Sequence, residues 1–228
     1  MINLLKFLSI ISVGNKILQQ NIENSVSAST CLQSSYDTVL NCYQNYFSNF
    51  NLTIGSEKIF PDYQTFVVRR AKLQISSNVT EFKNICNFQN KLTSCLGDAA
   101  NCINPQDLLK IGTFNNNDNY HYAGDYAMSK YECTEAYNYI LNNFNCLSSI
   151  SFLGHDMITK CTNDLEKNIP TKGECSALND YTNCLDNIYL SFCGNKAADF
   201  SCNILMITYN IEIPFCNGKF LKCNPLKD

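Results

Sequence analysis

Apolar side chains recur at intervals of three and four residues along much of this 228-residue chain. In the segment 175–193 the recurring residues are Leu178, Tyr181, Leu185, Ile188 and Tyr189. This spacing places them on one face of an α-helix, and Gly194, which follows, is the residue type at which helices often end. We therefore predict a helix over 175–193 that buries its apolar face.

Four other segments carry the same kind of pattern, and we predict helices there as well. They are 60–73, which has a proline near its first position, and 82–96, 136–144 and 153–165. The tail 204–213 is rich in Ile and Tyr, and its periodicity does not decide between helix and strand. The sequence therefore predicts an all-α, mainly helical protein.

Polar segments between these helices predict loops at 47–58, 112–126 and 165–174. The asparagine-rich loop at 112–126 is the predicted contact surface, because tyrosine combines apolar area with a hydrogen-bonding hydroxyl. Its candidate contact residues are Tyr120, His121, Tyr122 and Tyr126. The aspartates of this loop lack the spacing of a calcium-binding EF-hand, so we predict no metal there.

Cysteine is the most informative part of the composition. The fourteen cysteines are Cys31, Cys42, Cys86, Cys95, Cys102, Cys133, Cys146, Cys161, Cys175, Cys184, Cys193, Cys202, Cys216 and Cys223. No two of them are separated by only two residues, and the chain has only two histidines, so the pattern argues against a zinc cluster. An even number of cysteines in this arrangement predicts a disulfide-rich protein that is secreted into an oxidising, extracellular environment.

The interval between Cys175, Cys184 and Cys193 constrains how these three cysteines pair. Nine residues of helix rise about 13.5 Å, whereas bonded cysteines need Cα atoms within about 7 Å of each other. The three cannot bond to one another in one straight helix, so each must reach a different neighbouring element. The connectivity itself cannot be deduced from the sequence.

The N-terminal residues 1–18 are typical of a secretory signal peptide, because an apolar run too short to span a bilayer is followed by small residues. A buried first helix is the alternative interpretation. Residues 19–30 form a polar leader, and 31–223 are predicted to form a single disulfide-stapled helical domain. In a secreted chain the sequons at Asn51 and Asn78 predict surface glycans.

The charge of the chain argues against one class of partner. There are 17 basic and 20 acidic residues, for a net charge of −3, with no block of like charge. A protein that neutralises nucleic-acid phosphates needs a basic surface, so we do not expect nucleic acid as a partner. We also expect no membrane span, since no segment reaches the required length.

Two segments repeat one arrangement of residues. CNFQNKLTSCL begins at Cys86 and CSALNDYTNCL begins at Cys175. Both read C-x8-C-L with Thr two residues before the second cysteine, and a third cysteine follows each. The repetition indicates either an internal duplication or two amphipathic helices that converged on one spacing.

The order of these elements resembles a secreted, cysteine-rich family expanded in nematodes and known as domain of unknown function nineteen. The likeness rests on an opening C-x10-C helix from Cys31 to Cys42, an F-x3-C-x8-C-L-x5-C unit from Phe82 to Cys102, and a C-x8-C-L-x7-C-G unit from Cys175 to Gly194. It covers most of the chain after the first thirty residues. The resemblance implies a secreted, disulfide-linked fold; the family has no established catalytic residues, so none is carried over.

The leading hypothesis for function is a secreted, non-enzymatic interaction module, in host defence or at an extracellular surface. Loops on a cross-linked helical scaffold would then contact an extracellular protein or a glycan. A second hypothesis is a carrier of a small apolar or lipid ligand in a helical cavity. The residues that would line this cavity are Phe144, Ile150, Phe152, Leu153, Leu205, Met206 and Ile207.

A third hypothesis is a secreted hydrolase that uses His155 or a pair of acidic residues. A helical secreted phospholipase would place its histidine beside paired cysteines and a glycine-rich calcium loop, and neither accompanies His155 here. Asp156 is better explained as an acidic residue at the positive end of a helix. The sequence therefore predicts no catalytic residue and no cofactor.

Overall fold

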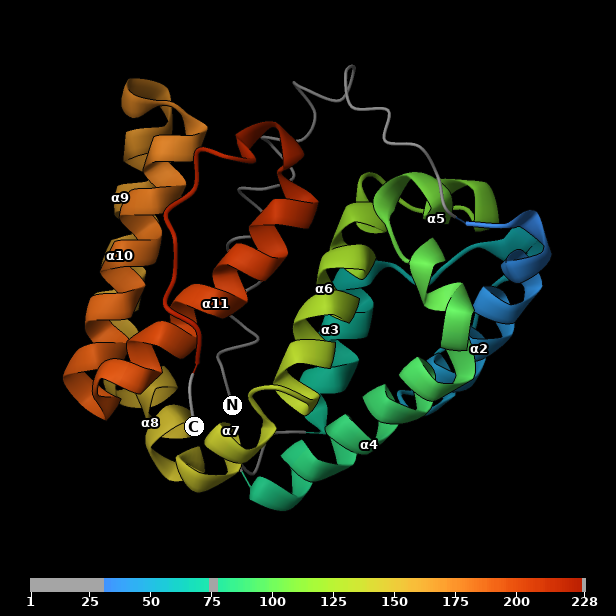
Figure 1. Ribbon diagram of the computed structural model, residues 1–228, viewed down its shortest axis with the longest axis horizontal. Helices are drawn as coiled ribbons and strands as arrows, with labels where there is room; N and C mark the ends of the chain where they lie inside the picture. The colour runs from blue at the N-terminus through green and yellow to red at the C-terminus, as the bar shows by residue number, and fades with distance from the viewer. Residues whose placement is uncertain (1–30, 74–77, 227–228) are drawn as a thin grey trace. The chain divides into compact units, whose positions relative to one another are not determined.

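A computed structural model describes residues 31–73 and 78–226 of the chain (Figure 1). These residues form α-helices joined by loops and short 3₁₀-helices, and the β-type pairing among them is an isolated bridge between Ile59 and Thr113. The all-α fold class predicted from the sequence is confirmed. The predicted signal peptide, 1–18, and the polar leader, 19–30, lie outside the described residues.

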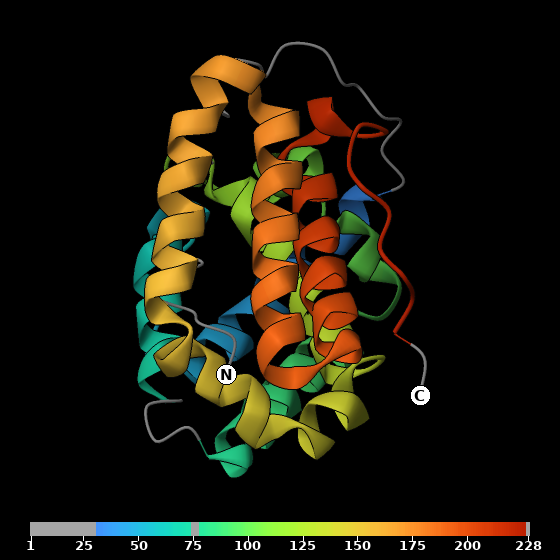
Figure 2. The same ribbon diagram turned by 90° about the vertical axis from the view of Figure 1, so that its left-hand side faces the viewer.

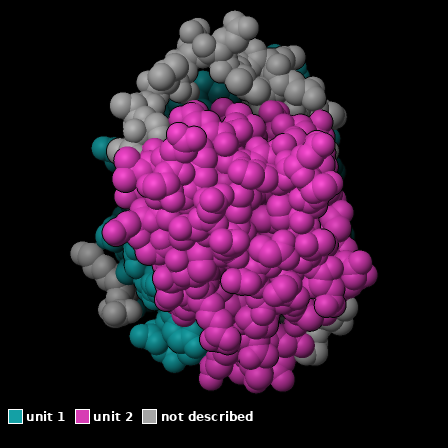
Figure 3. Space-filling model, turned by 90° about the vertical axis from the view of Figure 1, so that its right-hand side faces the viewer, with its two compact units in different colours: residues 1–21, 134–228 teal, residues 22–133 magenta. Residues whose placement is uncertain are grey.

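The described chain belongs to two compact units, residues 31–133 and 134–226, which we call the N-terminal unit and the C-terminal unit (Figure 3). Each unit has its own buried side chains and its own disulfides. The single domain predicted over 31–223 thus consists of two compact bodies.

Three helices of the N-terminal unit begin after a residue whose side chain caps the first turn. In chain order its elements are η1 (Gln33–Ser35), α2 (Tyr36–Ser48), η2 (Ser56–Lys58), α3 (Tyr63–Lys72), α4 (Val79–Leu96), η3 (Gly97–Cys102), α5 (Pro105–Ile111) and α6 (Asp118–Cys133). Before α3, the Asp62 carboxylate accepts a hydrogen bond from the Thr65 amide at 2.8 Å, and Asn78 accepts one from the Thr80 amide at 2.8 Å before α4. Such caps satisfy amides that have no partner within the helix.

The core of the N-terminal unit is largely aromatic. Tyr43 and Phe47 of α2 pack against Phe60, Phe66 and Tyr122, with ring centroids 5.4 to 6.3 Å apart. These contacts are all edge-to-face, the arrangement in which the positive edge of one ring meets the negative face of another. None of the five side chains is more than 2% exposed. Each contributes about 1.5–3 kcal/mol by leaving water, so this cluster is a main source of the unit's stability.

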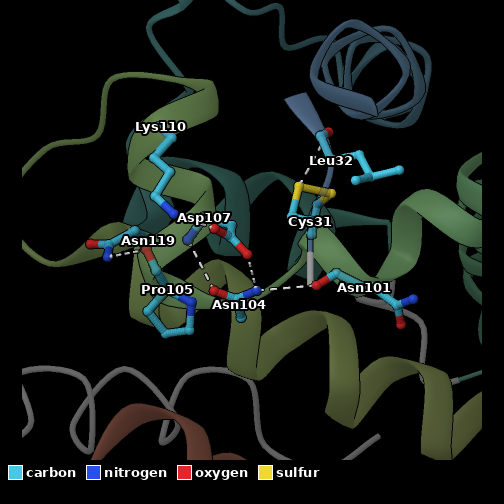
Figure 4. A network of polar contacts seen from close by, with 9 residues as sticks. Cys31, Leu32, Asn101, Asn104, Pro105, Asp107, Lys110 and Asn119 are labelled. Carbon is cyan, nitrogen blue, oxygen red and sulfur yellow. Dashed lines mark hydrogen bonds and ion pairs between the residues drawn. A yellow bond between two sulfur atoms is a disulfide. The ribbon is translucent and has the colours of Figure 1, made fainter. Parts of the chain in front are cut away.

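A second, polar network holds the start of α5 (Figure 4). The Asn104 side chain accepts a hydrogen bond from the Asp107 amide at 2.9 Å and donates one to the Asp107 carboxylate at 2.8 Å. Lys110 pairs with the same carboxylate at 2.7 Å, so this buried charge is compensated. Asn119 of α6 donates to the Pro105 carbonyl at 3.0 Å, which joins α6 to the beginning of α5.

Three disulfides tie the N-terminal unit together. They are Cys31–Cys102, Cys42–Cys95 and Cys86–Cys133. Cys31 lies next to Leu32 (Figure 4) and before η1, so it shares no helix with Cys42. The predicted C-x10-C helix is therefore wrong at its first cysteine. The chain instead enters α2 through Leu32, which is extended, and the 3₁₀-helix η1.

The C-terminal unit is built around α10. Its elements are α7 (Tyr137–Asn142), α8 (Phe144–Leu153), α9 (His155–Lys172), α10 (Glu174–Cys193), α11 (Asn195–Glu212) and η4 (Pro214–Cys216). Three long helices lie side by side, with α10 in contact with both α9 and α11 (Figure 2). As predicted, α10 ends before Gly194, whose φ of 83° is a conformation that suits glycine.

The cysteines of α10 reach three different neighbours, which confirms the constraint drawn from their spacing. The disulfides of this unit are Cys146–Cys193, Cys161–Cys184, Cys175–Cys216 and Cys202–Cys223. The first three connect α10 to α8, α9 and η4, and the fourth connects α11 to the C-terminal tail. Every one of the seven disulfides closes within a single unit.

Two predicted boundaries in the C-terminal unit differ from the structure. The loop expected at 165–174 is helical as far as Lys172, because Pro170 lies in the last turn of α9, where its missing amide affects only the end of the helix. Gly173, with a φ of 78°, then separates α9 from α10. The tail 204–213, which could have been helix or strand, is helical in α11 up to Glu212.

Candidate functional site

The predicted contact loop at 112–126 is not an exposed loop, and this expectation is wrong. Its second half is the beginning of α6. The candidate contact residues Tyr120, His121, Tyr122 and Tyr126 are all buried, none with more than 8% of its surface exposed. Side chains this deeply buried are out of reach of a macromolecular partner.

Two aspartates on the same helix, Asp118 and Asp125, make polar contacts inside the core. The guanidinium of Arg70 forms an ion pair with Asp125, and the Tyr63 hydroxyl donates to the same carboxylate at 3.1 Å. Asp118 accepts a hydrogen bond from the Tyr63 amide at 2.9 Å, and the His121 ring stacks on the Tyr63 ring at 5.2 Å. The polar residues that suggested a solvated loop therefore belong to an internal network.

Burial in this region changes acid–base behaviour without creating an accessible site. Loss of contact with water raises the pKa of Asp118 to about 6, although the hydrogen bond from the Tyr63 amide acts in the opposite direction. Burial likewise raises the pKa of Tyr46, with the charge of Arg70 opposing the shift. We therefore regard the network as part of the fold and not as catalytic machinery.

His155 and Asp156 lie at the start of α9. This is the position expected for Asp156 as an acidic residue at the positive end of a helix. The His155 Nδ1 atom is 3.0 Å from the Asp156 carboxylate, and both side chains are exposed. Both residues thus belong to the exposed first turn of a helix, where an acidic side chain is favoured by the positive end of the helix dipole. Within residues 31–73 and 78–226, no group of three or more His, Cys, Asp or Glu side chains is arranged to hold a metal ion.

The residues proposed to line a carrier cavity do not all lie in the interior of the C-terminal unit. Phe144, Ile150, Leu205 and Met206 are buried in the C-terminal unit, and Ile207 is half-buried. Phe152 is 83% exposed and Leu153 is 60% exposed at the end of α8. The set thus combines ordinary core residues with two surface residues.

A groove open to solvent is present in the C-terminal unit, and four of its seven lining residues are asparagines. Its volume is about 650 Å³, which is within the range of small-molecule sites. The residues that line it are Asn138, Tyr139, Asn142, Asn143, Cys193, Asn195 and Lys196. They come from α7, from the break between α7 and α8, and from the junction between α10 and α11. This groove is the candidate functional site.

The backbone around the groove is fixed by local structure on both sides. Asn143 leaves the helical conformation between α7 and α8, and its side-chain amide donates to the Tyr139 carbonyl at 2.9 Å. On the other side, Gly194 separates α10 from α11. The Cys146–Cys193 disulfide joins the two sides, so the groove has a covalently closed frame.

The side chains of the groove offer hydrogen bonds rather than reactive groups. Within the described residues, Asn138, Asn142 and Asn195 make no side-chain hydrogen bond, so their amides are available to a ligand. Each amide has one acceptor oxygen and two donor hydrogens. The Tyr139 ring packs on Phe200 at 5.6 Å, and burial together with the charge of Asp199 raises the pKa of its hydroxyl.

The sequence contains a signal for this groove that helical periodicity alone does not reveal. A single helical stripe was predicted over 136–144, but Asn142 and Asn143 interrupt it. Asparagine favours helix ends because its side chain competes for backbone hydrogen bonds, so consecutive asparagines indicate a break. The junction at 193–196 could not be connected with this break without the structure.

Comparison with known proteins identifies no relative of this chain. No protein-family model, no curated protein and no solved structure matches the chain. In the part of the chain that the structure describes, none of the helices is both long and apolar enough to cross a membrane.

Proposed function

We propose that this protein is a secreted, non-enzymatic binding module that holds an extracellular ligand in the polar groove of its C-terminal unit. The observation that carries the proposal is the set of asparagine amides that make no hydrogen bond within the described residues, on a frame closed by the Cys146–Cys193 disulfide. A groove lined mainly by asparagine amides, with no paired acid and base and no histidine among its lining residues, suits binding better than catalysis. A role in host defence or at an extracellular surface would be consistent with such a module.

Secretion belongs to the same proposal, as does membership of the cysteine-rich family that the sequence resembles. Seven disulfides fit an oxidising environment, because they would not persist among cytosolic reductants. We also propose N-glycans at Asn51 and Asn78, both of which are exposed. The Asn78 oxygen caps α4, while the nitrogen that would carry a glycan makes no hydrogen bond within the described residues.

Expression of the full chain in a secretory eukaryotic cell tests the location and the glycans. We expect oxidised protein in the medium, and enzymatic removal of N-glycans should lower its mass. The variants Asn51→Gln and Asn78→Gln should each lack one glycan. Retention of the native chain inside the cell with reduced thiols would contradict the proposal, and an unchanged mass would exclude both glycans.

The binding proposal is tested by capture from extracellular fluid with the full-length native protein. One bait variant replaces Asn138, Asn142 and Asn195 by Ala, and a matched control replaces three exposed asparagines outside the groove: Asn163, Asn183 and Asn187. We expect at least one protein, glycan or small molecule to be retained by the native and control baits and lost from the groove variant. If no captured material depends on the groove asparagines, the proposed site is wrong.

An apolar carrier remains a separate alternative with its own readout. Native mass spectrometry of the secreted protein should then show a bound lipid that survives substitution of the groove asparagines. Because Phe152 and Leu153, two of the seven proposed lining residues, are exposed at the surface, we expect the polypeptide with its glycans alone. A hydrolase that uses His155 would instead lose its activity in His155→Ala, whereas ligand capture should be unaffected by this change.

A further inference from the structure

We propose that the ligand of the groove is a short saccharide chain, and that neutral or acidic sugars are preferred over sugars that carry amines. This inference rests on the proposed function, because it names the chemical class that the same groove would bind. It follows from the kinds of polar groups that line the groove, from their charge and from the size of the space.

The amide side chains match the hydrogen-bonding character of sugars. A sugar hydroxyl both donates and accepts, and neighbouring hydroxyls present these roles in alternation along the ring. Asn138, Asn142 and Asn195 each provide an acceptor oxygen and two donor hydrogens without an internal partner among the described residues. An aliphatic ligand would leave these amides unpaired on binding, which is costly, whereas hydroxyl groups would replace the water they lose.

The charge of the lining distinguishes between classes of sugar. Lys196 is the charged residue among those that line the groove, and the Asp199 carboxylate, whose charge acts on the Tyr139 hydroxyl, lies outside this lining. A carboxylate or sulfate on the ligand would therefore meet a positive charge, while an amine would meet a like charge. Because Lys196 is exposed, its effect on affinity is modest, about threefold for one ligand charge.

The size and rigidity of the groove are appropriate for a few sugar units. About 650 Å³ of open space accommodates more than a single small molecule such as a monosaccharide, and the open side allows a chain to continue into solvent. The Cys146–Cys193 disulfide and the packing of Tyr139 on Phe200 hold the two sides of the groove in place. A frame fixed before binding reduces the ordering cost that weakens most sugar complexes.

Binding of the native full-length protein to an array of immobilised di-, tri- and tetrasaccharides tests the inference. The array contains neutral members, members with carboxylate or sulfate groups, and members with free amines. We expect binding to a subset of neutral and acidic members, and a loss of about fivefold or more in affinity for Asn142→Ala, the effect of one hydrogen bond. Lys196→Gln should weaken acidic ligands about threefold and leave neutral ligands unchanged, while Lys160→Gln, an exposed lysine on α9, should change neither.

A second readout tests whether the bound sugar lies in the groove. In protein labelled with ¹⁵N at asparagine, the side-chain amide signals of Asn138, Asn142 and Asn195 should shift on addition of the best array ligand, and those of Asn183 and Asn187 should not. Binding only to amine-bearing sugars would overturn the charge preference, and absence of any saccharide binding would overturn the ligand class. If capture from extracellular fluid still depends on the groove, for example with a peptide as the ligand, the proposed function stands and the saccharide inference alone fails.

Discussion

The Cys146–Cys193 disulfide borders the groove, and the stability lost on its removal can be worked out from the connectivity. Its cysteines are 47 residues apart in the sequence, but the Cys161–Cys184 bridge shortens the path between them. The shorter path runs from Cys146 to Cys161 and from Cys184 to Cys193, or roughly 24 residues. The chain-entropy relation gives about 3.5 kcal/mol for a closed loop of this length.

The perturbation is the double variant Cys146→Ala with Cys193→Ala, which leaves no free thiol. Guanidinium chloride unfolding of the unreduced protein, followed by the helical circular dichroism signal, should show a loss of about 3.5 kcal/mol in the free energy of unfolding. Hydrogen exchange should place the lost protection in residues 134–226. The matched control, Cys42→Ala with Cys95→Ala, should lower protection in residues 31–133 instead. A loss below about 1 kcal/mol, or a loss of protection confined to residues 31–133, would refute the reasoning.

Two further predictions concern buried charges. Arg70→Met leaves the Asp125 carboxylate without its partner, so we expect a loss of about 3–5 kcal/mol in urea unfolding, largely recovered when Asp125→Leu is added; native-like stability of the single variant would contradict the buried pair. Burial raises the pKa of Asp118 to about 6 and that of Asp186 to about 7, so both groups bind protons more tightly in the folded state. Their stabilising contribution is complete below the unfolded pKa of 3.8 and is lost as the pH rises through about 6 to 7. Between pH 3.8 and about 7 we expect the free energy of unfolding to fall less in Asp186→Asn than in the native protein. The exposed control Asp98→Asn should keep the native slope. If the three plots of unfolding free energy against pH are parallel, burial of Asp186 does not affect stability.

The parts of the fold that could be predicted are those determined by neighbouring residues. The apolar stripe of α10 and Gly194 at its end identify this helix because both signals are local. The spacing of Cys175, Cys184 and Cys193 further required separate partners, since helix geometry alone excludes pairing among them. The identity of each partner depends on how helices pack, and no spacing rule provides it.

The interpretation of α6 failed for a different reason. Asp118, His121 and Asp125 are polar, and periodicity treats polar residues as exposed. Their burial depends on Arg70 and Tyr63, which are more than fifty residues away in the sequence and supply the compensating charge and hydrogen bonds. The pattern of polar and apolar residues within one segment therefore cannot predict a buried network whose partners lie in another segment.

The groove also depends on residues that are distant in the sequence. Residues 138–143 and 193–196 come together through the packing of α8 against α10 and through the Cys146–Cys193 bridge. The asparagine pair at 142–143 marked a break in the helix, but nothing in the sequence indicated what would lie opposite it.

Peptide mapping of the unreduced protein by mass spectrometry tests most directly whether the protein is two disulfide-closed units with a groove framed by one of those bridges. We predict seven linked peptide pairs, among them Cys146 with Cys193, and none that joins a cysteine of residues 31–133 to one of residues 134–226. Free thiols at these positions, or a bridge between the two ranges, would contradict the account.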